Sequence, residues 1–436
     1  GLHPRDNNML LDTLQELKHK GNSIVIVEHD EDTIRRADHI VDLGPGGGVE
    51  GGHLVAQGSL QDILETEGSV TARFLAKPLT HPRFPRRVTD RETRYLTVRG
   101  ASLHNLTSID VSLPLERVIC VTGVSGSGKS TLVRDIIHRN LRPRVGSGKP
   151  APSTWHGCEE IHGYGDLRYV REVDQTPIGK TPRSCPATYV GFWDDVRKLF
   201  AGLPESRMRG YTASRFSFNT PDGRCPECGG QGLKRIEMNF LPDVTVVCER
   251  CGGKRFTDDT LEVEYRGKSI ADILDMSVDE AVDFFEAHKN IHRAVEMLRD
   301  VGLGYLKLGQ QSPTLSGGEA QRIKLVTELA KARGGGGSGA LYLLDEPTIG
   351  LHMADVENLI RVLRRLTEAG HTVVVIEHNL DVIAEADWII DLGPEGGDGG
   401  GRVVAAGTPE NVAAAREQSH TGRYLAPVLT EGVRHA

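Results

Sequence analysis

Apolar and polar residues alternate near the start of the chain in a way that predicts a helix and then a strand. Leucines recur at helical spacing between Asp6 and Lys20, so they lie on one face, and Gly21 ends the predicted helix. The apolar run Ser23–Val27 then predicts a short buried strand that ends at Glu28-His29. This order, with polar residues at the strand's carboxyl end, is typical of an α/β fold with a site at that edge.

The same pattern returns near the other end of the chain. Shifted by 349 residues, 1–58 aligns with 350–407 without a gap, and close to half of the positions are identical. The second predicted strand is Thr372–Ile376, followed by Glu377-His378. The chain therefore contains two copies of one module's end. We expect the first copy to be the remnant of a module whose second copy is whole.

A glycine-rich loop follows another predicted strand, Val118–Thr122. Gly123–Ser130 matches GxxxxGK[ST], and LVRDIIHR continues as a helix, which is the context that identifies a P-loop. Lys129 is expected to reach the β- and γ-phosphates of ATP, and Ser130 to ligate Mg²⁺. The predicted nucleotide-binding residues of this loop are Gly123, Ser125, Gly126, Gly128, Lys129, Ser130 and Thr131.

LYLLDEP predicts a buried strand that delivers two carboxylates at its end. Asp345 is suited to the Mg²⁺ shell and Glu346 to polarising the attacking water as a general base. His378, at the end of the next strand, is a candidate contact for the γ-phosphate or that water. A lone histidine is more often structural, but the Glu-His pair recurs in both copies, which favours function.

Four of the seven cysteines form two CxxC pairs, Cys225/Cys228 and Cys248/Cys251, with 19 residues between the pairs. This spacing predicts a closed, structural Zn²⁺ site of four thiolates. Paired cysteines in an odd total favour metal binding in a reducing compartment over a disulfide framework.

Composition adds little beyond a globular protein. The chain has 436 residues, enough for two or three domains, with 38% hydrophobic and 26% charged residues. The sequence shows neither a membrane-spanning run nor a signal-peptide pattern. The net charge of −8 gives no global attraction to nucleic acid, so DNA contacts must come from placed residues. The candidates for DNA contacts flank the cysteines and are Lys234, Arg235, Lys254 and Arg255. An equally good interpretation is that these side chains form a solvated surface without a DNA contact.

LSGGE, at 315–319, resembles the signature of ABC-type ATPases. The resemblance implies that Ser316, Gly317 and Gly318 complete the ATP site of the opposite nucleotide-binding domain. Gln175 resembles the Q-loop glutamine that senses Mg²⁺ and the γ-phosphate, and Asp345, Glu346 and His378 match the Walker B pair and the switch histidine.

Longer runs, including VDQTPIGKTPRSCPATYVG, CPECGGQG, CERCGGKR and LSGGEAQRIKL, are similar in sequence and order to the UvrA family. Its members are the damage-recognition ATPases of the bacterial excinuclease. Two stretches depart from the family pattern, Arg144–Gly163 and the GGGGSG at 334–339, which predicts a flexible loop.

The resemblance implies an α/β, ABC-type P-loop ATPase domain with an inserted zinc-binding α+β signature domain, preceded by the remnant of a first ATPase domain. The expected divisions are 1–76 remnant, 77–94 linker, 95–177 P-loop part, 178–305 zinc-containing signature domain, and 306–436 signature, Walker B and switch part.

The implied function is ATP-dependent recognition of damaged double-stranded DNA in nucleotide excision repair, with handover to a UvrB-like, nuclease-loading subunit. The expected cofactors are ATP, Mg²⁺ and Zn²⁺, the location cytoplasmic without membrane contact, and the full-length form a homodimer. Cutting is left to a partner, because the carboxylates belong to the nucleotide site. Two alternatives remain: a UvrA-like ATPase that serves drug resistance, and a DNA-binding fragment with little hydrolysis.

Overall fold

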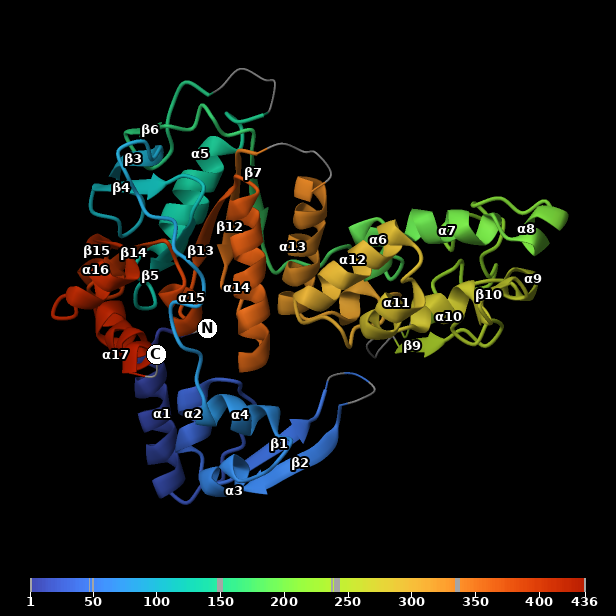
Figure 1. Cartoon of the computed structure of the whole chain (residues 1–436), viewed down its shortest axis with the longest axis horizontal. Coiled ribbons are helices and arrows are strands. Elements are labelled where there is room, and N and C mark those ends of the chain that lie inside the picture. Colours follow the sequence, from blue (N-terminus) through green and yellow to red (C-terminus); the bar gives the residue numbers. More distant parts are fainter. Residues whose placement is uncertain are drawn as a thin grey trace. The chain divides into compact units, whose positions relative to one another are not determined.

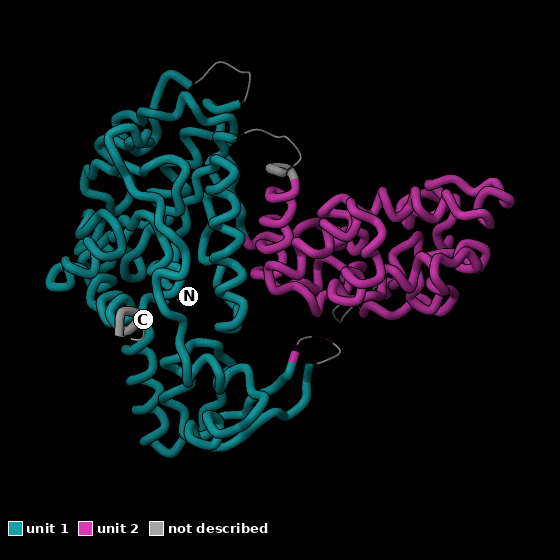
Figure 2. Tube along the Cα trace, viewed as in Figure 1, with its two compact units in different colours: residues 1–45, 51–174, 332–436 teal, residues 46–50, 175–331 magenta. Residues whose placement is uncertain are grey.

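A computed structural model describes residues 2–46, 48, 51–146, 152–236, 238, 244–333 and 338–434 (Figure 1). It divides into two compact units, which Figure 2 distinguishes by colour. Unit 1 comprises 1–45, 51–174 and 332–436, and unit 2 comprises 46–50 and 175–331. The domain divisions expected from the sequence stay a prediction. Of the predicted glycine-rich loop, residues 334–337 lie outside the described part of the chain.

A six-stranded sheet forms the centre of unit 1. Its order is β15-β14-β5-β13-β12-β7, and neighbouring strands are parallel except β14 and β15. The strands are β5 (Val118–Thr122), β7 (Tyr169–Val173), β12 (Ala340–Asp345), β13 (Thr372–Ile376), β14 (Trp388–Gly393) and β15 (Arg402–Gly407). β5 and β13 are buried along their whole length, as apolar strands inside a parallel sheet should be. The strands predicted at these positions and in LYLL are confirmed.

Helices and two smaller sheets complete unit 1. The sheets are β4-β3-β6, from β3 (Tyr95–Ala101), β4 (Ile109–Pro114) and β6 (Glu160–His162), and the hairpin of β1 (Ile40–Gly44) and β2 (His53–Gly58). The helices are α1 (Pro4–His19), α2 (Glu31–Arg36), α3 (Leu60–Leu64), α4 (Val70–Ala76), η2 (Thr131–His138), α5 (Arg139–Leu141), α14 (Met353–Glu368), α15 (Leu380–Ala384), η4 (Gly397–Gly399), α16 (Pro409–Ala414) and α17 (His420–Arg434). η2 starts at the P-loop and packs its apolar side chains into the core against the central sheet.

Unit 2 is mainly helical. Its elements are α6 (Pro186–Val190), α7 (Trp193–Ala201), α8 (Pro204–Met208), β8 (Leu233–Ile236), β9 (Val244–Val247), α9 (Asp258–Leu261), β10 (Glu264–Tyr265), β11 (Lys268–Ser269), α10 (Ile270–Asp275), α11 (Val278–Phe284), α12 (Lys289–Asp300), η3 (Ser312–Thr314) and most of α13 (Gly317–Arg333). α12 buries Ile291, Ala294, Val295 and Leu298, the spacing of one helical face. Among the helices of the described residues, none is long and apolar enough to cross a membrane.

The two copies of the repeat form matching hairpins. In β1–β2 the pairing starts with Ile40 opposite Gly58, and in β14–β15 with Ile389 opposite Gly407. Each first strand carries an irregularity after the third residue that pairs with its partner strand, Asp42 in β1 and Asp391 in β14. Because these positions differ by the repeat's shift of 349 residues, the internal similarity extends to strand register.

The strand predicted at Ser23–Val27 does not form, so this prediction is wrong. These residues have no regular secondary structure, and Val25 and Val27 are 93% and 90% exposed. Their counterpart β13 is hydrogen-bonded by β12 on one side and β5 on the other. The described part of the first copy has only β1 and β2, which pair with each other. A strand needs neighbouring backbone groups, and the apolar pattern cannot supply them.

The segment 77–94, expected to be a linker, is tied to unit 1 by a buried histidine. His81 is 3% exposed, with Nδ1 2.7 Å from Glu385 Oε1 and Nε2 2.8 Å from Asp381 Oδ1. Burial by itself lowers the pKa of His81, but the hydrogen bonds and charges of the two carboxylates outweigh it and raise the pKa to about 9. The imidazole is therefore charged at neutral pH and attaches the segment to α15.

This contact predicts a pH-dependent stability. The folded-state pKa of His81 is about 9 against an ordinary 6.5, so its contribution is complete below about pH 6.5 and is lost as the pH rises through about 9. Between about pH 6 and about pH 9.5, we expect the free energy of unfolding to fall more in the native chain than in a His81→Gln variant, by about 1–3 kcal/mol. Urea titrations at the two pH values measure it, and equal falls in both proteins would contradict it.

Candidate functional site

The residues predicted to bind phosphate form the loop between β5 and η2. Gly123 has φ +130°, and a Cβ there would lie 2.0 Å from the carbonyl oxygen of Leu392, so only glycine fits. Lys129 is 7% exposed, and its Nζ donates to the carbonyl oxygens of Gly123 and Val124 at 2.9 and 2.8 Å. A tight glycine turn, a lysine drawn into it and a helix behind it are the components of a phosphate-binding loop. The same loop contains Ser125, Gly126, Gly128 and Ser130, and Thr131 is the first residue of η2.

Three more predicted residues lie at the carboxyl ends of adjacent strands. β12 ends at Asp345 and is followed by Glu346, while His378 follows β13. Because β12, β13 and β5 are parallel neighbours, these ends meet the P-loop at one edge of the sheet. His378 Nε2 is 3.6 Å from Glu346 Oε1. The structure therefore brings the predicted Walker B pair, switch histidine and P-loop together.

The charged groups at this edge have shifted pKa values. Burial lowers the pKa of Lys129, and burial followed by the charge of Glu346 raises that of Asp345. For Glu346, burial by itself raises the pKa, and the hydrogen bond to His378 is the largest of the contributions that outweigh burial and lower it. Glu346 is thus ionised at neutral pH, as a general base must be.

The two copies of the repeat contact each other reciprocally here. The ring of His3 lies 6.0 Å from that of His378, nearly at right angles. His352, which matches His3 in the repeat, lies 6.4 Å from His29, which matches His378. Each copy's Gly-Leu-His therefore faces the other copy's Glu-His.

Residues of the first copy reach the P-loop, and sequence reasoning gave them no role. His3 is 1% exposed, its Nε2 is 3.1 Å from Thr421 Oγ1, and burial lowers its pKa to about 3. The Asp6 carboxylate accepts a 2.9 Å hydrogen bond from the backbone N–H of Ser125. The repeated Gly-Leu-His was the only signal that pointed to this segment.

The predicted signature residues form the start of α13 in unit 2. Ser316 and Glu319 make a capping box, with Glu319 Oε2 accepting from Ser316 N at 2.7 Å and Ser316 Oγ from Glu319 N at 3.2 Å. Gln175 packs on the first signature glycine, since a Cβ at Gly317 would lie 3.2 Å from the Cβ of Gln175. Within unit 2, the Q-loop glutamine and the Ser316–Gly318 turn are therefore neighbours.

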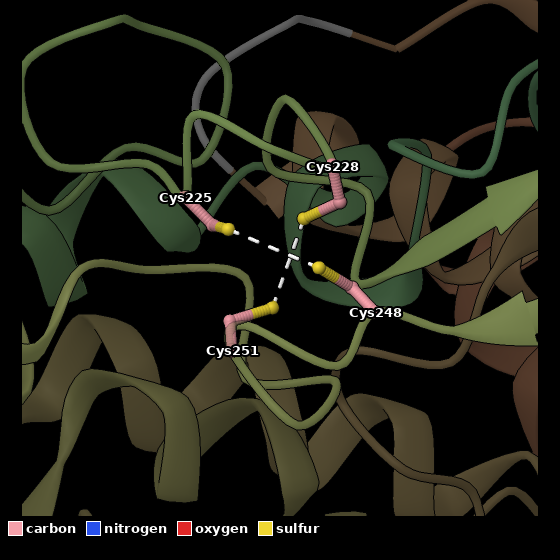
Figure 3. A group of neighbouring side chains, drawn as sticks. All are labelled: Cys225, Cys228, Cys248 and Cys251. Atoms are coloured by element: carbon pink, nitrogen blue, oxygen red, sulfur yellow. Dashed lines mark hydrogen bonds between the residues drawn. The ribbon is translucent and has the colours of Figure 1, made fainter.

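Four cysteines converge in unit 2, with Cys225 and Cys228 before β8 and Cys248 and Cys251 after β9 in the sequence, and their side chains point toward one another (Figure 3). Their sulfur atoms lie within 4.8 Å of one another, with Cys225 4.0 Å from Cys248 and Cys228 3.7 Å from Cys251. Zn–S bonds of about 2.3 Å in a tetrahedron place sulfurs about 3.8 Å apart. The buried cluster therefore fits a zinc ion held by four thiolates, with no open position for chemistry.

Three of the four basic DNA candidates are accessible. Lys254 and Arg235 are exposed, and Lys234 is half-buried and paired with Glu227. Arg235 also lines a cavity of about 440 Å³. The other lining residues are Pro182, Gln231, Leu233 and Thr245.

Arg255 differs from these. It is 7% exposed, its Nη2 donates to the carbonyl oxygen of Gly309 at 2.7 Å, and its guanidinium lies 5.3 Å from the centre of the Phe218 ring. Such a side chain is not available to a phosphate, so the expected DNA contact at Arg255 is not retained.

No protein-family model matches the chain. It is 54% identical to the UvrABC system protein A of Thermus thermophilus over 428 residues, which are 98% of this chain and 44% of that protein. The protein of the same name from Methanothermobacter thermautotrophicus is 53% identical over 431 residues, 99% of this chain and 44% of the relative. The chain thus spans a little under half the length of the curated relatives it matches.

The structure agrees with these relatives. The crystal structure of UvrA2 from Deinococcus radiodurans superposes with a TM-score of 0.88 at 48% identity, over 98% of this chain and 51% of that one. Sequence identity over nearly the whole chain and the fold together show that the chain belongs to the UvrA family.

Proposed function

We propose that this chain couples ATP binding and hydrolysis to the recognition of damaged double-stranded DNA in nucleotide excision repair. The observation that carries the proposal is the meeting of the P-loop, Asp345, Glu346 and His378 at one sheet edge, in a chain that also holds a four-cysteine cluster. The names of the relatives support the repair role. No observation favours the drug-resistance alternative.

The nucleotide site has a distinct task for each residue. When bound, ATP supplies the phosphoryl group and Mg²⁺ neutralises its charge. Lys129 contacts the β- and γ-phosphates, Ser130 and Asp345 hold the Mg²⁺ shell, and Glu346 takes a proton from the attacking water. His378 holds that water or the γ-phosphate. These roles fit the ionised state of Glu346 and its 3.6 Å approach to His378.

The signature and zinc elements connect this site to partners. Ser316, Gly317, Gly318 and Gln175 serve an ATP site shared with the opposite nucleotide-binding domain, and the full-length form is a homodimer. The zinc ion has a structural role. DNA is recognised through its shape and deformability, with phosphate contacts from Lys234, Arg235 and Lys254. A UvrB-like subunit receives the damaged site, and a cytoplasmic location follows from the DNA substrate.

Lys129→Ala tests the nucleotide site. Loss of a buried charge that contacts two phosphates should weaken ATP binding by about 10- to 100-fold. Titration with a fluorescent ATP analogue measures the affinity. Lys198→Ala, on the surface of α7, is the matched control, because its side chain is 72% exposed. Undiminished binding by Lys129→Ala would refute the assignment.

The chain alone should bind ATP but hydrolyse it slowly. Its sequence holds one P-loop and one LSGGE, and the proposed sites each need a P-loop and a signature from opposite domains. Steady-state phosphate release is the measurement, with light scattering to detect dimers. A monomeric chain that reaches the rate of the full-length protein contradicts the proposal.

The cysteine cluster should hold about one zinc ion per chain. Cys248→Ser removes one of four ligands, so the variant should lose the metal and melt several degrees lower. Elemental analysis and thermal unfolding monitored by circular dichroism give both values. Cys158→Ser, outside the cluster, should keep the metal. A native chain that melts identically with and without its zinc would disprove a structural role.

A further inference from the structure

Glu377, which precedes the switch histidine, has a buried carboxylate with a full set of donors. The residue is 1% exposed. Its Oε1 accepts from the backbone N–H and the hydroxyl of Thr348 at 3.0 and 2.6 Å. Its Oε2 accepts from the backbone N–H groups of His378 and Asn379 at 2.7 and 2.9 Å. Four donors match the roughly four lone-pair directions of a carboxylate.

The first oxygen holds the loop that carries Glu346. Thr348 lies two residues after Glu346 and accepts a hydrogen bond from Leu351 N at 3.0 Å, which closes the turn. Glu346 itself has φ +45°, a left-handed conformation that is costly for a residue with a side chain. Such a conformation persists only where surrounding contacts enforce it, and the bonds from Thr348 to Glu377 are among those contacts.

The second oxygen holds the loop that carries His378. The next residue, Asn379, caps α15 by accepting from the N–H groups of Asp381 and Val382. The direction of the His378 side chain is therefore set between Glu377 and a capped helix. One carboxylate thus joins the loops that carry Glu346 and His378, whose side chains approach to 3.6 Å.

The first copy of the repeat shows that the acid alone does not build this arrangement. Its counterpart, Glu28, is exposed and accepts a hydrogen bond from the backbone N–H of His29 at 3.1 Å. Glu377 gains the two Thr348 donors because β12 lies beside β13 and brings the loop after Asp345 next to it.

We propose that Glu377 is a positioning residue for ATP hydrolysis: it fixes the Glu346 loop and the His378 loop relative to each other through its two carboxylate oxygens. This role rests on the proposed function of the same site. Because Glu377 contacts the loops and not the phosphate-binding turn, it acts on hydrolysis rather than on ATP affinity.

Glu377→Gln isolates the effect. The amide keeps one accepting oxygen, but its NH₂ group faces N–H donors, so one loop loses its anchor. In the full-length protein that carries this chain, we expect kcat for ATP to fall by about 10- to 100-fold while KM changes by less than about threefold. Thr348→Val, which removes only the hydroxyl bond, should lower kcat less, and the two substitutions together should be less than additive.

Glu385→Gln is the matched control. Glu385 is 2% exposed and accepts from the backbone N–H groups of Arg83 and Phe84, away from the two loops. The Glu385→Gln substitution should lower the stability of the fold about as much as Glu377→Gln does, and it should leave kcat nearly unchanged. Hydrogen exchange in the isolated chain adds a readout without turnover: peptides that contain Thr348 and His378 should both exchange faster in Glu377→Gln, and the Thr348 peptide should be unchanged in Glu385→Gln.

The outcomes separate this inference from the proposed function. If the native protein does not bind ATP, the proposed function fails, and exchange at the two loops still decides whether Glu377 orders them. The inference is overturned if Thr348 exchange is unchanged in Glu377→Gln. It is equally overturned if kcat stays at the native value, or if kcat and KM shift as they do in Glu385→Gln.

Discussion

Parallel pairing of β13 with β12 on one side and β5 on the other determines where the chemistry of unit 1 lies. Parallel strands end at the same edge, so segments far apart in the chain deliver a glycine loop, two acids and a histidine to one place. The fully buried strands allow little displacement, because shifting the register would carry apolar side chains out of the core. Backbone hydrogen bonds between three short strands thus set the geometry that the side chains use.

The same constraint explains what the sequence predicts well. β5, β12 and β13 are continuous apolar runs, so these three strands were predictable from the sequence pattern. The P-loop was predictable because the spacing of its residues follows from the local geometry that the motif requires. The cysteine cluster was predictable for a similar reason, because two CxxC pairs leave few other chemical interpretations. Ser23–Val27 has a similar apolar pattern to β13 but no flanking strands, and its failure shows that burial belongs to the assembled sheet rather than to the segment.

Contacts between distant residues were beyond the sequence. Arg255 sits among basic neighbours in the sequence, and only the fold reveals that it points inward to Gly309. His81 stands in a segment rich in proline and arginine, with nothing nearby to suggest two carboxylates some 300 residues away. Glu377 was visible as part of a repeated Glu-His, yet its four donors come from two loops that meet only after β12 and β13 pair.

The carboxylate of Asp6 on the P-loop has a consequence for any phosphate that binds there. The Ser125 N–H is already satisfied, so a phosphate oxygen must displace a side chain that is held beside the loop by the rest of its own chain. A tethered competitor acts at an effective concentration on the order of millimolar, whatever the concentration of protein. In the proposed phosphate site, affinity would therefore reflect a competition between phosphate and the Asp6 carboxylate, and a movement of α1 that withdraws Asp6 would strengthen the binding of phosphate.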